Sequence, residues 1–237
     1  MTALIECVLF DIDNTLLMKR PSIPEKVYET ARTFLPGLAF EDVERAYAQS
    51  ELWQGEQIQR ENETGARMPD EEFLKNIFGV YRNALGLPEK ALGELRGVFM
   101  RNYFMEYEPA FGAVETLERL KSRGLKLGIV SNNTPEVRAH LAELGLDRFF
   151  QSIVISEEVG LYKPDPAILE LACEQLGAAP GDSVYVGDHP FDILCGHAAG
   201  MPVIWMPVNP YMTVPGHIGP PEHTVGALAE IVELLDK

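Results

Sequence analysis

Two aspartates, Asp11 and Asp13, stand two residues apart directly after the apolar run Cys7-Val8-Leu9-Phe10. This run predicts a short buried strand, so both carboxylates follow a strand's carboxyl end, where open α/β sheets bind their ligands. Two acids there repel each other and lose solvation, so a cation is expected to join them. Mg²⁺ prefers carboxylate, carbonyl and water oxygens, which makes the pair a candidate magnesium site. The segment alone is equally consistent with a solvated acidic turn.

Polar side chains also follow three later apolar runs that predict strands. They are Ser131 and Asn132 after 125–130, Lys163 across a loop after 152–155, and Asp188 and Asp192 after 183–186. Each has a structural explanation, because Ser131 and Asp188 could cap helices and Lys163 could be a solvated surface lysine. Their coincidence at successive strand ends instead favours one crevice shared with Asp11 and Asp13.

The second half of the chain alternates helical and strand patterns. Helices are expected at 113–123, 136–144, 166–176, 191–199 and 227–235, and strands at 125–130, 152–155, 183–186 and 203–206. This alternation predicts a parallel sheet with right-handed crossovers, an α/β fold of the Rossmann-like, doubly wound kind. Residues 207–223 are rich in proline and glycine and predict a long loop of undetermined role.

Residues 23–105 have helical patterns throughout, which predicts a small helical bundle. The expected helices are 24–31, 40–60, 69–85 and 89–103, with a loop at 62–65. The bundle separates the first strand from the rest of its sheet and therefore reads as an insertion. We expect a core domain of residues 1–18 and 108–237 and an inserted helical domain of residues 19–107.

Composition limits the possible partners. The 237 residues carry a net charge of -16, which argues against nucleic acid or an anionic membrane as a partner. No apolar run is long enough to span a membrane, and the first ten residues lack the features of a secretion signal. Cys7, Cys173 and Cys195 lie in apolar segments without a paired spacing, as in a reduced cytoplasmic protein.

Four segments together resemble the haloacid dehalogenase superfamily of phosphotransferases. They are Asp-x-Asp-x-Thr at 11–15, Ser-Asn at 131–132, Lys-Pro at 163–164 and Gly-Asp-x-x-x-Asp at 187–192. The resemblance covers nearly the whole chain, and their order and spacing are highly specific together. The insertion after the first motif resembles the helical cap of phosphoglycolate phosphatase and of several nucleotidases.

The resemblance implies a role for each motif residue. Asp11 would attack phosphorus to form an aspartyl-phosphate, and Asp13 would protonate the leaving oxygen and then activate water. Phosphate contacts would come from Asp11, Ser131, Asn132 and Lys163. Mg²⁺ would be held by Asp11, the main-chain carbonyl of Asp13, Asp188 and, through water, Asp192, which could alternatively orient Lys163.

The implied function is magnesium-dependent hydrolysis of a small phosphorylated metabolite. The alternatives are a 2-haloacid dehalogenase, a phosphosugar mutase and a non-catalytic receiver-like phosphoacceptor. Asp13 favours phosphate esters, because dehalogenases of this superfamily lack that acid and a receiver needs none.

Substrate contacts in the cap are less defined. The candidates are Trp53, Arg60, Arg67, Lys19 and Arg20, for which bundle packing or solvation is the competing interpretation. The substrate itself, and whether the protein is a monomer or a homodimer, stay open.

Overall fold

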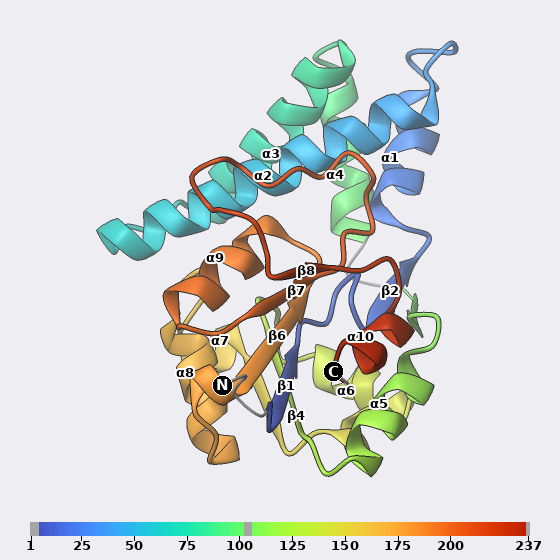
Figure 1. Ribbon diagram of the computed structural model, residues 1–237. Coiled ribbons are helices and arrows are strands. Elements are labelled where there is room, and N and C mark those ends of the chain that lie inside the picture. The colour runs from blue at the N-terminus through green and yellow to red at the C-terminus, as the bar shows by residue number, and fades with distance from the viewer. Residues whose placement is uncertain (1–4, 102–105, 236–237) are drawn as a thin grey trace. The chain divides into compact units, whose positions relative to one another are not determined.

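The computed structural model describes residues 5–101 and 106–235, and the chain divides into two compact units (Figure 1). The core unit comprises Met1–Met18, Glu108–Val208 and Val214–Lys237. The helical unit comprises Lys19–Tyr107 together with Asn209–Thr213. Within the described ranges, no helix combines the length and the apolar character needed to cross a membrane.

A parallel sheet forms the centre of the core unit. Its strands are β1 (Cys7–Phe10), β4 (Lys126–Ser131), β5 (Ser152–Ile155), β6 (Ser183–Gly187), β7 (Val203–Trp205) and β8 (His223–Thr224). They are ordered β5-β4-β1-β6-β7-β8, so β1 lies between β4 and β6. Leu9 of β1 is in register with Gly128 and Tyr185. The predicted α/β class and parallel sheet are confirmed.

Helices cover both faces of this sheet. They are α5 (Ala113–Ser122), α6 (Val137–Glu143), α7 (Ser156–Val159), α8 (Ala167–Leu176), α9 (Pro190–Ala198) and α10 (Leu228–Leu234), with short 3-10 turns at Asp147–Phe149 and Pro180–Asp182. Figure 1 shows α8 and α9 on one side of the sheet and α5 and α10 on the other. Apolar side chains such as Leu9, Ile168 and Ile193 are fully buried between these layers. This burial fixes the strands whose ends carry the polar groups.

The three cysteines are free and buried, as expected from their apolar surroundings. Burial raises the pKa of the Cys7 thiol to about 12 and also raises the pKa of Cys173 and Cys195. A thiol is a nucleophile only when ionised, so these pKa values indicate core residues.

The described residues of the helical unit form four helices. They are α1 (Ile23–Ala31), α2 (Phe40–Thr64), α3 (Asp70–Leu85) and α4 (Ala91–Arg101). The loop predicted at 62–65 is wrong, because α2 continues to Thr64 and ends at Gly65, whose φ is 70°. Hydrogen bonds from Gln57 to Glu61 and from Gln59 to Glu63 support the last turns at i,i+4 spacing. The predicted end of the fourth helix, at residue 103, lies outside the described residues.

Three short strands were not predicted. β2 (Leu17–Arg20) pairs with β3 (Glu106–Pro109) in a separate two-stranded sheet, and β8 extends the main sheet beside β7. These segments have two to four residues and include exposed polar positions. They therefore lack the apolar run or clear alternation that identifies a strand in sequence.

The segment Asn209–Thr213 groups with the helical unit, although the expected core range of 108–237 included it. Asn209 Nδ2 donates a hydrogen bond to the carbonyl of Glu44 in α2 at 2.8 Å. The guanidinium of Arg45 lies 4.5 Å from the ring centroid of Tyr211. These side-chain contacts join the predicted loop at 207–223 to α2. They connect residues that are far apart in the sequence, so no local sequence pattern indicates them.

Candidate active site

Asp11 extends the buried strand β1 at its carboxyl end. All four residues of β1 are buried, and the amide of Asp11 donates to the carbonyl of Val186 at 2.9 Å. The turn that follows uses Asn14 at a φ of 57°, a conformation that asparagine adopts more readily than most residues. Asn14 Nδ2 donates to Asp188 Oδ2 at 3.2 Å. The first motif and the end of β6 are therefore directly connected.

The ammonium of Lys163 is at the centre of this site. It donates to Asp11 Oδ1 at 2.8 Å, to Asp192 Oδ1 at 2.7 Å and to the hydroxyl of Tyr185 at 2.8 Å. Lys163 is only 7% exposed. An ammonium has three N–H groups, so three acceptors match its donors in number. Although burial alone would lower it, Asp11 and Asp192 hold the pKa of Lys163 well above its ordinary value.

The backbone of Lys163 is held by Asn132. Asn132 Oδ1 accepts from the amide of Lys163 at 2.8 Å, and Asn132 Nδ2 donates to the carbonyl of Lys163 at 2.9 Å. Asn132 was predicted to contact phosphate, but both its amide oxygen and its amide nitrogen are hydrogen-bonded to the backbone of Lys163. This geometry gives Asn132 a role in placing Lys163.

Asp192 lies in the first turn of α9. Its Oδ2 accepts from the amide of His189 at 3.0 Å, while the ring of His189 accepts from the amide of Phe191 at 3.1 Å. This reciprocal cap fixes the start of the helix. Gly187 makes the arrangement possible, because a Cβ at that position would overlap the Asp192 carboxylate.

Three carboxylates in the described part of the chain form a group that could hold a metal ion. One oxygen from each of Asp11, Asp188 and Asp192 lies within 4.8 Å of the others. Such a set of hard oxygen donors fits a small divalent cation. Both oxygens of Asp192 already accept hydrogen bonds from Lys163 and His189, so Asp11 and Asp188 are the better placed direct ligands.

Asp11 and Asp13 have different surroundings. Asp11 is 6% exposed, and burial raises its pKa to about 6 against the opposing effect of Lys163. Asp13 is half-buried, and Asn133 Nδ2 donates to its Oδ2 at 3.2 Å. The backbone of Asn133 is itself held by Ser156 Oγ, which lies 3.0 Å from its amide nitrogen. Ser131, the last residue of β4, is buried at the same edge of the sheet.

Sequence reasoning missed Asn14 and Tyr185 as members of this cluster, and it placed Asn133 at the shared edge without giving it a role. Asn14 and Asn133 stand inside or beside recognisable motifs, so their position was a usable signal. Tyr185 had no such signal, because an aromatic residue in a buried strand is typical of a core position.

The predicted cap residues lie in the helical unit and make packing or polar contacts there. The rings of Trp53 and Phe73 pack with centroids 5.3 Å apart. Arg67 Nη1 lies 3.6 Å from Glu61 Oε2, and Arg60 Nη1 donates to a glutamine of the same helix at 3.4 Å. The ammonium of Lys19 lies 5.8 Å from the ring centroid of Tyr107, and Arg20 is exposed. All of these contacts lie within the helical unit, and a contact between any of these residues and a substrate stays a prediction.

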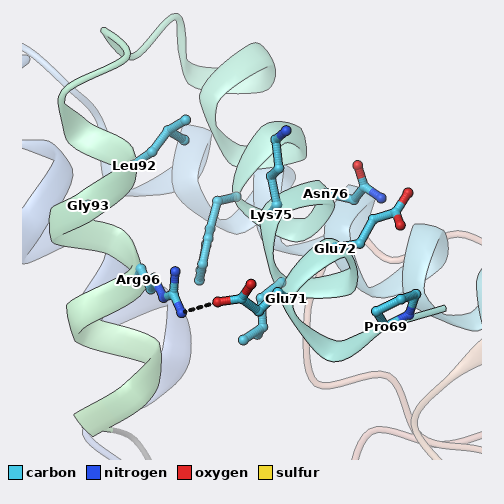
Figure 2. Close-up of a pocket in the computed structure, with 10 residues that line it drawn as sticks. Pro69, Glu71, Glu72, Lys75, Asn76, Leu92, Gly93 and Arg96 are labelled. Atoms are coloured by element: carbon cyan, nitrogen blue, oxygen red, sulfur yellow. Dashed lines mark hydrogen bonds and ion pairs between the residues drawn. The ribbon is translucent and has the colours of Figure 1, made fainter.

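A cavity of about 700 Å³ lies between α3 and α4 of the helical unit (Figure 2). Its lining includes the apolar side chains of Leu74 and Leu92 and charges of both signs. Arg96 Nη2 donates to Glu71 Oε1 within it at 3.2 Å. The five predicted cap residues are not among the lining residues.

A doubly wound parallel sheet with a carboxylate–lysine cluster at its carboxyl edge is an arrangement typical of α/β enzymes. Residues 5–200 match the family model described as haloacid dehalogenase-like hydrolase. The chain therefore belongs to this family, and the predicted membership and hydrolase class are confirmed.

Relatives include phosphatases and a dehalogenase. A glyceraldehyde 3-phosphate phosphatase from Methanopyrus kandleri is 32% identical, with 84% of this chain and 82% of the relative covered. A pyrophosphatase PpaX from Halalkalibacterium halodurans is 30% identical, with 83% and 81% covered. A crystal structure of a dehalogenase is 26% identical and has a TM-score of 0.68, with 98% of both chains covered.

Proposed function

We propose that this protein is a magnesium-dependent phosphohydrolase that cleaves a small phosphorylated metabolite through an aspartyl-phosphate on Asp11. Two relatives with matches over most of their length are named as a phosphatase and a pyrophosphatase. The observation that carries the proposal is the pair of differently placed acids at the end of β1. Asp11 is buried against Lys163, whereas Asp13 is half-buried beside Asn133.

This difference suits two chemical roles. Asp11 attacks phosphorus with a carboxylate oxygen, and the bond to the leaving oxygen breaks as that oxygen takes a proton from Asp13. Asp13 then removes a proton from the water that cleaves the aspartyl-phosphate. Proton transfer of this kind contributes roughly 10²–10⁴-fold in rate.

The other groups stabilise charge around the phosphoryl group. Lys163 holds Asp11 in place and supplies a positive charge next to the nucleophile, and the Ser131 hydroxyl donates a hydrogen bond to a phosphoryl oxygen. Asp11 and Asp188 would hold Mg²⁺, with Asp13 contributing its main-chain carbonyl. The bound ion would neutralise charge on the phosphoryl oxygens.

Turnover of p-nitrophenyl phosphate tests the proposal directly. We expect product release with Mg²⁺, loss of release after EDTA treatment and recovery when Mg²⁺ is restored. Asp11→Asn should abolish turnover while the circular dichroism spectrum stays that of the wild type. Activity of that variant near the wild-type level would overturn the assignment of the nucleophile.

A haloacid dehalogenase is the second candidate, because a dehalogenase structure matches over nearly the whole chain. In that chemistry Asp11 would displace halide from carbon, and no leaving-group acid would be needed. Halide release from 2-chloropropionate that persists in EDTA and in Asp13→Asn would favour this candidate. Phosphate release that is lost in Asp13→Asn would exclude it.

A further inference from the structure

We propose that Tyr185 is a positioning residue whose hydroxyl fixes the ammonium of Lys163 against Asp11. Tyr185 lies in β6, is fully buried, and accepts a hydrogen bond from Lys163 Nζ at 2.8 Å. Its role in catalysis rests on the proposed function, whereas its hold on Lys163 can be measured without turnover.

The orientation of the tyrosine hydroxyl follows from its partners. The hydroxyl can donate one hydrogen bond, and the carbonyl of Val130 lies 2.9 Å away, closer than the 3.5 Å to Asp192 Oδ1. Donation to Val130 leaves the oxygen lone pairs of Tyr185 directed to the ammonium. Tyr185 therefore links Lys163 to β4, one residue before Ser131.

A neutral acceptor is the chemically suitable third partner. Asp11 and Asp192 already place two carboxylates on one ammonium. A third carboxylate would add repulsion inside a buried site, whereas an empty third position would let the ammonium rotate about its stem. The tyrosine oxygen completes the set of acceptors and adds no charge. The Tyr185 hydroxyl thereby keeps the ammonium of Lys163 within hydrogen-bonding distance of Asp11.

The kinetic test compares Tyr185→Phe with Tyr81→Phe. Tyr81 is also 0% exposed but belongs to the helical unit, so its variant controls for the loss of a buried hydroxyl. We expect Tyr185→Phe to lower kcat about tenfold, since one hydrogen bond to a charged group is lost. KM should change by less than about threefold, because Tyr185 holds Lys163, the partner of the nucleophile Asp11, and does not itself contact the substrate. Tyr81→Phe should keep both constants.

The second readout is the ¹⁵N signal of the Lys163 ammonium, recorded in the cold below neutral pH and assigned by its loss in Lys163→Met. Its protons should exchange with water several-fold faster in Tyr185→Phe than in the wild type or Tyr81→Phe. An unchanged kcat or an unchanged exchange rate in Tyr185→Phe overturns the proposal. If the wild type lacks phosphatase activity, the proposed function fails and the catalytic role of Tyr185 fails with it, while the exchange rate still decides whether Tyr185 holds Lys163.

Discussion

Replacing Lys163 with methionine tests whether the buried ammonium holds the site together. Methionine keeps most of the apolar stem but leaves the carboxylates of Asp11 and Asp192, which are 6% and 1% exposed, without their counter-charge. Removing one partner of a buried ion pair typically costs about 3–5 kcal/mol. We therefore expect Lys163→Met to lose about 3–5 kcal/mol of unfolding free energy at about pH 8.

The loss of unfolding free energy in Lys163→Met should be smaller at acidic pH. Burial already raises the pKa of Asp11 to about 6 in the presence of Lys163, and removal of the lysine should raise it further. The folded variant then binds more protons than its unfolded chain, so its stability increases as the pH falls through the folded pKa. The difference between wild type and variant should consequently be smaller at about pH 5 than at about pH 8.

Urea unfolding followed by tryptophan fluorescence provides the assay. The chain has two tryptophans, so a Trp53→Phe background restricts the signal to Trp205 in β7 of the core unit. EDTA removes the contribution of bound metal. Lys126→Met is the matched control, because Lys126 makes an exposed hydrogen bond to the carbonyl of Gly177 at 2.8 Å. Equal losses in the two variants, or a Lys163→Met loss that grows in acid, would refute the reasoning.

Three further changes have defined outcomes. Gly187→Ala forces a Cβ against the Asp192 carboxylate and should lower turnover about tenfold or more. Gly181→Ala, where nothing lies within 4 Å, should leave turnover unchanged, and equal activity of both variants would contradict the packing argument. Without metal the pKa of Asp11 is raised to about 6, and a bound cation should lower it, so kcat/KM measured at about pH 5.5 should increase with Mg²⁺ concentration more steeply than at about pH 8, and equal Mg²⁺ dependence at the two pH values would count against Asp11 as both nucleophile and ligand. Tyr211→Ala removes a ring that lies 4.5 Å from a guanidinium of α2, so limited proteolysis should cut the 209–213 segment sooner than in the wild type; an unchanged cleavage rate would show that this contact does not hold the segment.

The sequence predicted the core sheet because buried parallel strands are continuous apolar runs. The runs at β1, β4, β5 and β6 each end in a polar residue or lead to one, which located the shared edge before any contact was known. Short polar strands such as β8 and the attachment of Asn209–Thr213 to α2 depend on tertiary contacts instead. Local pattern carries no information about such contacts.

The site was predictable at the level of residue types but not of contacts. Asp11, Lys163 and Asp192 were predicted to share a crevice, and the structure places them within hydrogen-bonding distance. The two-sided amide bridge from Asn132 to the backbone of Lys163 spans 31 positions of sequence. The hydroxyl of Tyr185 joins an apolar strand to a charged cluster. Such pairings depend on how loops and strands pack, which a single sequence does not encode locally.

The charge balance of the cluster explains how an acidic chain could accept an anionic substrate. The chain carries a net charge of -16, and the site places Asp11 and Asp192 against the ammonium of Lys163, with Asp188 near both acids and Asp13 two residues from Asp11. Four ionised carboxylates and one ammonium leave three negative charges, which would repel a phosphate ester. A divalent cation at Asp11 and Asp188 would remove two of these three charges, so most of the repulsion that a phosphate ester meets at this site would disappear when the cation binds.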